Sequence, residues 1–192
     1  MKIKLNKYTA VILVIIMIST IIYNENIIKA DNMFSGNGSL NGWSYDDSWS
    51  NGTYTGAGSC VYDSDSNMMK VSLDYSGDSS TSWSQTGISR TSWSGIDFSE
   101  YTKVSIDLYY DSTAYTKGSL YVKLAADELF GDNVINIFKQ EYTDMGNGKR
   151  KVNLVFDIDQ NLAQYDKPYK FLVLFAGSNT DYKGDIYIER IT

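Results

Sequence analysis

Hydrophobic and polar residues alternate along much of this 192-residue chain. Every second position is apolar in five segments, 69–75, 104–110, 120–126, 152–156 and 169–175, and Ile186 and Ile188 continue the pattern near the end. Alternation with a period of two is typical of strands that bury one face. Turn-forming residues separate the segments at 76–78, 115–118, 146–149 and 181–184.

Long helical patterns are missing between these segments. Residues 159–165 are the exception, because Leu162 and Tyr165 share helical spacing and predict one or two turns. Many short strands without alternating helices favour an all-β fold, an antiparallel β-sandwich of the jelly-roll kind. We predict a single β-sandwich domain over residues 31–192, with no internal repeat and no linker.

The first 30 residues have the pattern of a secretory signal peptide. Lys2, Lys4 and Lys7 form a basic start, residues 9–22 are mostly apolar, and Ala30 is a small residue at the expected cleavage point. We therefore expect a secreted, extracellular protein with no membrane attachment after cleavage. An uncleaved N-terminal anchor is the alternative interpretation.

Charge and composition narrow the possible functions. The chain carries 17 basic and 23 acidic residues, for a net charge of −6, and this acidity makes nucleic acid an unfavourable partner. The absence of histidine excludes Ser-His-Asp and Cys-His mechanisms and histidine-ligated metals. Cys60 is the only cysteine, so we expect no intramolecular disulfide and interpret it as a small buried hydrophobe. A pair of carboxylates is the remaining catalytic option.

All four tryptophans are followed by serine, at positions 43, 49, 83 and 93. Their neighbours are Ser, Gly, Asp and Thr, in which a large flat ring can reach solvent and offer an apolar face. Tyr109 and Tyr121 lie opposite the aliphatic positions of their strands. Those two tyrosines either form a flat binding face or fill the second buried side of an inner strand.

Several segments together resemble carbohydrate-binding module family 27, the β-sandwich modules that are attached to secreted β-mannanases and bind mannan-type chains. The resemblance begins in MMKVSLDYSG, TSWSQTGISR and YTKVSI between residues 68 and 106, continues through YTKGSL at 115–120 and through 149–156, and ends in GDIYIERI at 184–191. It covers essentially all of residues 33–192, and the order and spacing of the segments carry it.

The resemblance implies a set of sugar-binding residues. Trp83 matches the family's platform tryptophan, Gln85 stands where the family commonly has an acidic residue, and Arg90 matches a family arginine. Either Trp43 or Trp49 matches an N-terminal tryptophan. A further family tryptophan, in the loop after the strand at 120–126, has Phe130 as its nearest substitute.

The resemblance also implies a structural calcium ion near the two chain ends. Glu189 matches the family's carboxylate on the last strand, and Met33 and Ser35 stand where an N-terminal carboxylate would be needed.

From these features we expect a secreted, monomeric, non-catalytic module that binds mannan, glucomannan or galactomannan. It is either a stand-alone module or a fragment of a longer mannanase. One alternative is a small jelly-roll glycoside hydrolase, which needs two carboxylates about 5 to 9 Å apart. The other is a surface adhesion domain that uses its aromatic residues for protein contacts.

Overall fold

A computed structural model describes residues 32–51, 58–77, 83–93, 98–126, 129–163 and 169–192. The predicted signal peptide, residues 1–30, lies outside these ranges. Within them there is no helix that is long and apolar enough to cross a membrane.

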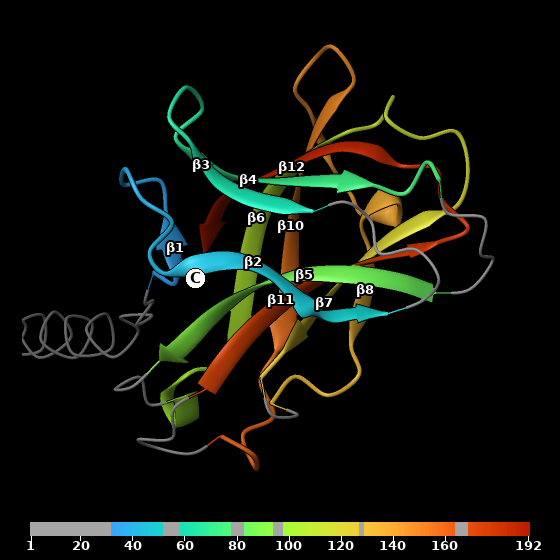
Figure 1. Ribbon diagram of the computed structural model, residues 1–192. Coiled ribbons are helices and arrows are strands. Elements are labelled where there is room, and N and C mark those ends of the chain that lie inside the picture. The colour runs from blue at the N-terminus through green and yellow to red at the C-terminus, as the bar shows by residue number, and fades with distance from the viewer. Residues whose placement is uncertain (1–31, 52–57, 78–82, 94–97, 127–128, 164–168) are drawn as a thin grey trace, which may run out of the picture. The chain divides into compact units, whose positions relative to one another are not determined.

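The described residues form two antiparallel β-sheets that pack face to face, which confirms the predicted β-sandwich (Figure 1). The seven-stranded sheet has the order β3-β4-β12-β6-β10-β9, with β1 paired to β12. Its strands are β1 (Phe34–Ser35), β3 (Ser59–Asp63), β4 (Met68–Asp74), β6 (Lys103–Asp111), β9 (Thr143–Asp144), β10 (Lys149–Asp157) and β12 (Lys183–Ile191).

The five-stranded sheet has the order β2-β5-β11-β7-β8. Its strands are β2 (Trp43–Asn51), β5 (Trp83–Trp93), β7 (Ser119–Ala125), β8 (Val134–Asn136) and β11 (Tyr169–Ser178). Two single-turn 3-10 helices, η1 (Phe98–Glu100) and η2 (Ile137–Lys139), lie in the connections.

The core lies between the sheets and is made by the alternating apolar positions. In β4 burial alternates residue by residue, and Val71 and Leu73 point inward. Leu108 and Leu154 do the same from β6 and β10, and Val122 does so from the opposite sheet. Removing these side chains from water is the main favourable contribution to folding.

Strands β2 and β5 were not predicted, because their inward positions are not consistently apolar. Ser84 and Thr86 are both fully buried on the inner face of β5, next to Ile88. Such a strand lacks the apolar alternation that marks a strand in a sequence. Trp49, Trp83 and Trp93 of the Ser-Trp-Ser segments lie in these two strands.

Residues 159–163 form one turn, in which the amides of Leu162 and Ala163 donate to the carbonyl of Asp159 at 3.0 and 3.1 Å. The prediction of one or two turns is met by this single turn, and Tyr165 lies outside the described residues.

Cys60 packs against the edge of the core and is only partly buried. Burial raises the pKa of its thiol to about 12, so the group stays protonated at neutral pH. It behaves as the small hydrophobe that we expected.

Two connections between the sheets lie against each other at one corner. Gly118 follows β6 and has φ = +79°, and an added Cβ there would lie 2.2 Å from the carbonyl oxygen of Asn179, in the connection from β11 to β12. Only glycine permits both this conformation and this close approach. The corner joins both sheets, so it helps to fix the orientation of their outer faces.

Candidate functional site

Trp83 lies on the outer face of the five-stranded sheet and is partly exposed. Its ring stacks on Tyr121 with the centroids 5.2 Å apart and an interplanar angle of 28°. The two residues belong to β5 and β7, which lie on either side of β11. The intervening outward residues of β11 are Ala176 and Ser178, whose small side chains leave room for the rings to meet.

Gln85 fixes the orientation of the Trp83 ring. The indole Nε1 donates a hydrogen bond of 2.8 Å to the Gln85 Oε1. With the N–H paired inside the protein and one ring face against Tyr121, the indole offers an apolar face to a ligand. A ring held in this way loses little entropy when it binds.

Gln85 and Tyr121 belong to one row of outward residues that crosses the sheet. The register pairs Gln85 with Ala176, Ala176 with Tyr121, and Tyr121 with Asn136. The Asn136 Oδ1 accepts from the Phe138 amide at 3.0 Å, while its buried Nδ2 has no hydrogen-bond partner among the described residues. The row therefore presents an aromatic ring and the uncharged amide of Gln85, groups suited to the hydroxyls of a neutral ligand, while the Asn136 amide is buried.

Two ion pairs lie beside this row. Lys123 contacts Asp132 at 2.8 Å, and Lys170 contacts Asp46 at 2.8 Å. Burial by itself would raise the pKa of Asp46, but hydrogen bonds from Lys170 and Ser48 outweigh it and hold that pKa well below its ordinary value. The hydrogen bond from Lys123 lowers the pKa of Asp132. Both carboxylates near the platform are thus ionised and already paired.

The carboxyl groups with shifted pKa values in the described ranges do not include the general acid that a glycoside hydrolase needs. A glycosidase needs one carboxyl group with a raised pKa to act as the general acid. Within the described ranges, every carboxyl group whose pKa departs from its ordinary value is shifted downward.

The structure contradicts the prediction that Trp43 could stack on a sugar. Trp43 is only 2% exposed, belongs to the core, and donates from Nε1 to the carbonyl of Met33 at 3.2 Å. Its polar neighbours along the chain point away from it, because successive residues of a strand face opposite sides.

Arg90 also lies away from the platform. Its register partner is the inward residue Phe171, whereas Trp83 pairs with outward Ser178. The guanidinium donates to the Met33 carbonyl at 3.1 Å, and burial lowers its pKa. Arg90 thus helps to hold the N-terminal segment, and the expectation that it orients a sugar beside Trp83 is wrong.

Phe130 is likewise a core residue. It is 2% exposed and packs edge-on against Phe171 with the centroids 5.8 Å apart. A ring enclosed in this way has no face for a ligand, so Phe130 does not replace a platform tryptophan.

Trp49 and Trp93 lie in β2 and β5 respectively, but their side chains lie outside the described part of the structure. The prediction that Trp49 binds sugar therefore stays a prediction.

Glu189 lies on the outer face of the other sheet and faces a lysine. The Lys151 Nζ is 2.5 Å from the Glu189 Oε2, and the Tyr109 hydroxyl donates to the same oxygen at 3.0 Å. The hydrogen bond from Lys151 is the main reason that the pKa of Glu189 is lowered. No group of three His, Cys, Asp or Glu side chains that could hold a metal ion occurs in the described ranges. The residues around Glu189 do not fit the calcium site that the resemblance implies.

The two outward tyrosines have different roles. Tyr121 is partly exposed and stacks with Trp83, whereas Tyr109 is 8% exposed beneath the contacts of Lys151 and Glu189. Only Tyr121 contributes to a flat outer face, and its position out of phase with the aliphatic residues of β7 was the signal in the sequence.

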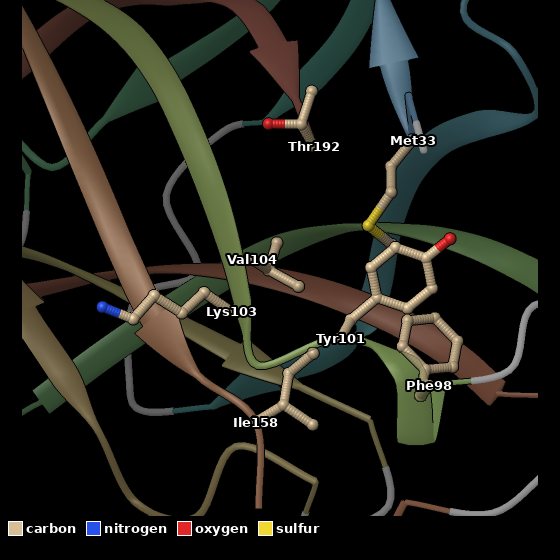
Figure 2. A pocket seen from close by; sticks show the side chains of 7 residues that line it. All are labelled: Met33, Phe98, Tyr101, Lys103, Val104, Ile158 and Thr192. Atoms are coloured by element: carbon tan, nitrogen blue, oxygen red, sulfur yellow. The ribbon is translucent and has the colours of Figure 1, made fainter. Parts of the chain in front are cut away.

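A small apolar cavity lies at one end of the sandwich, lined among others by Met33, Phe98 and Ile158 (Figure 2). Its volume of about 20 Å³ is close to that of one water molecule, so it cannot hold a sugar ring.

Comparisons with known proteins support the fold. No family profile and no curated protein matches the sequence. A carbohydrate-binding module specific for non-crystalline cellulose, CBM28, superposes with a TM-score of 0.58 at 18% identity, over 81% of this chain and 89% of its own.

Two mannan-related structures are also similar. CBM27-1 of Caldicellulosiruptor saccharolyticus in complex with mannohexaose has a TM-score of 0.58 at 18% identity, over 80% of this chain and 90% of its own. The mannan-recognising module TmCBM27 has a TM-score of 0.52 at 17% identity, over 79% and 87%. This chain thus has the fold of these carbohydrate-binding modules.

Proposed function

We propose that this protein is a secreted, monomeric, non-catalytic module that binds a neutral polysaccharide of the β-mannan type. The observation that carries the proposal is the partly exposed Trp83 ring, which Tyr121 and Gln85 hold on the outer face of the five-stranded sheet. A pyranose ring has an apolar face of C–H groups, which can pack on an indole face that is already oriented.

The Gln85 amide and the Tyr121 hydroxyl, both on partly exposed residues, supply the polar part of the proposed site. These groups carry no charge and can pair with sugar hydroxyls. The row crosses the strands, so a linear polysaccharide would run across the sheet and meet several of these groups in succession. The ion pairs beside it are internally neutralised and offer no unbalanced charge for a charged polymer.

Mannan is the proposed ligand for two reasons. The sequence resembles carbohydrate-binding module family 27, and two of the structures with the same fold were determined for mannan recognition. A third structure with this fold is specific for non-crystalline cellulose, so cello-oligosaccharides are the comparison ligand.

Isothermal titration of residues 31–192 with mannohexaose and cellohexaose tests the proposal. We expect binding of mannohexaose, and a loss of at least about tenfold in affinity, or ~1.4 kcal/mol, in Trp83→Ala. Calorimetry is preferred to fluorescence, because the substitution removes an intrinsic reporter.

Tyr142→Ala is the matched control, because Tyr142 is 48% exposed and lies next to β9 in the other sheet. Its affinity should equal that of the wild type. Failure of both oligosaccharides to bind, or unchanged affinity in a folded Trp83→Ala variant, would refute the proposed function. Tighter binding of cellohexaose than of mannohexaose would leave Trp83 as the binding platform but would show that the preferred ligand is a cellulose-type chain.

A further inference from the structure

A polar hollow lies on the outer face of the seven-stranded sheet, where β1 meets β12. Ser35 and Glu189 line it together with Asp107 and Lys151. The resemblance implied a calcium site between Glu189 and an N-terminal position near Met33 and Ser35, and of these residues Ser35 and Glu189 line the hollow. The hollow also contains two cationic side chains, Lys151 and Arg190.

Two carboxylates of this hollow each have a cation of the protein as their partner. Glu189 contacts the Lys151 Nζ at 2.5 Å, and the Asp107 Oδ2 accepts from the Arg190 guanidinium at 2.6 Å. Asn153 also donates to Asp107, at 2.6 Å. A divalent cation here would meet two positive charges at short range, and repulsion at such distances costs several times more at a protein surface than in bulk water.

The lysine contacts join three neighbouring strands. Lys151 comes from β10, Tyr109 from β6 and Glu189 from β12, and these strands are adjacent in the sheet. The ammonium lies 5.2 Å from the centroid of the Tyr109 ring, whose hydroxyl donates to the same Glu189 oxygen. Each member of this cluster therefore contacts the other two.

Hydrogen bonds attach the segment from Met33 to Gly36 to the rest of the domain. The Met33 amide donates to the Ile191 carbonyl at 2.7 Å, and the Asn67 Nδ2 donates to the Gly36 carbonyl at 2.8 Å. These hydrogen bonds link the segment to the last strand and to the turn before β4.

We propose that the Lys151 ammonium is the resident cation of this hollow: it cross-links β6, β10 and β12 through Glu189 and Tyr109, so the fold requires no calcium. The proposal does not depend on the ligand or on the platform of the other sheet. Its test is thermal unfolding, which is a separate readout from glycan binding.

Thermal unfolding of residues 31–192 is measured with excess EDTA and with calcium, for the wild type and for Lys151→Met. We expect the wild-type Tm to be the same in both solutions. Lys151→Met should lower Tm by about 3–6 °C, because Lys151 and Glu189 are only partly exposed and share a third partner. A wild-type Tm that falls in EDTA and recovers with calcium would overturn the proposal.

Lys103→Met is the matched control. Lys103 pairs with Asp157 at 3.9 Å between the same strands, β6 and β10, but both side chains are largely exposed. This variant should change Tm by no more than about 1 °C. Equal effects of the two lysine substitutions would contradict a special role for Lys151.

A double-mutant cycle separates the charge of Lys151 from the packing of its methylene groups. Glu189→Gln should lower Tm in the wild type and should have little further effect in Lys151→Met, because the partner is already gone. Strictly additive shifts would show that the two side chains act independently, which would refute the cross-link.

Discussion

The two sheets of this sandwich bury similar apolar faces but present different outer faces. On the five-stranded sheet, Trp83 and Tyr121 stack over the small residues of β11 and remain partly exposed. On the seven-stranded sheet, Tyr109 is covered by Lys151 and Glu189 and is 8% exposed. Both faces contain outward aromatic rings, but the stacked pair formed by Trp83 and Tyr121 lies on the five-stranded sheet.

The side chains next to the rings cause this difference. The residues between Trp83 and Tyr121 are Ala176 and Ser178, which are too short to cover a ring. The register partners of Tyr109 are Lys151 and Tyr187, and the Lys151 ammonium contacts both Glu189 and the Tyr109 ring. The size and charge of the cross-strand neighbours therefore decide whether an outward aromatic ring stays uncovered.

The largest expected effect is a loss of stability caused by a substitution on the outer face of the seven-stranded sheet. Asp107 has 9% of its side chain exposed and accepts hydrogen bonds from Arg190 and Asn153, which hold its pKa below the ordinary value although burial opposes them. Asp107→Ala removes the shared partner of both donors and should lower the free energy of unfolding by about 2–3 kcal/mol. Chemical denaturation measures this change.

The same variant tests whether the two faces are independent. If Asp107→Ala folds, its affinity for mannohexaose should equal that of the wild type, because Asp107 lies on the opposite sheet from Trp83. A large change in affinity without unfolding would mean that the charged face takes part in binding.

An intermediate effect, on ligand affinity, is expected for a substitution on the outer face of the five-stranded sheet. Tyr121→Ala removes the ring that supports Trp83 and should weaken mannohexaose binding about three- to tenfold, or roughly 1 kcal/mol. Calorimetric titration measures the loss, and thermal unfolding should show only a small decrease in Tm. Tyr187→Ala is the control, since this partly exposed tyrosine lies on the outer face of the other sheet. Equal losses of affinity in Tyr121→Ala and Tyr187→Ala would contradict the conclusion that the two outer faces differ.

The sequence predicts the strands best where burial depends on one apolar face. Strands β4, β6, β7, β10 and β11 follow the alternation that we identified, and all lie in the expected sandwich. Strands β2 and β5 escaped prediction because polar residues such as Ser84 and Thr86 occupy inward positions. Whether a short hydroxyl side chain is buried depends on the residues of the opposite sheet. The sequence of one strand does not give that information.

The site could be predicted only in part for a related reason. Trp43 and Trp83 have similar small, polar neighbours along the chain, but the sandwich places one in the core and the other on an outer face. Which face a strand residue takes depends on its register with the neighbouring strands, and a one-residue shift would exchange the two sides. The contact between Tyr121 and Trp83 could not be predicted from the sequence, because it depends on the position of β11 between their two strands.

The smallest effect should come from the corner that joins the two sheets. Asp181, between β11 and β12, accepts hydrogen bonds from the Thr116 hydroxyl and from the amides of Thr116 and Lys117, between β6 and β7. The Thr116 hydroxyl is the main reason that the pKa of Asp181 is lowered from 3.8 to about 2. Since the folded state favours the ionised form, this contribution to stability is present above about pH 4 and is lost as the pH falls toward 2.

Asp181→Asn should therefore be slightly less stable than the wild type at neutral pH, by about 2 °C in Tm, because solvent screens the interactions of this partly exposed residue. The difference should shrink as the pH is lowered from 4 to 2, and mannohexaose affinity at neutral pH should be unchanged. Thermal unfolding between pH 2 and pH 7 measures the convergence, with Asp65→Asn in an exposed turn as the control that should follow the wild-type curve. A constant difference across this range would show that Asp181 acts through hydrogen-bond geometry alone. A change in affinity would show that the corner also positions the aromatic face.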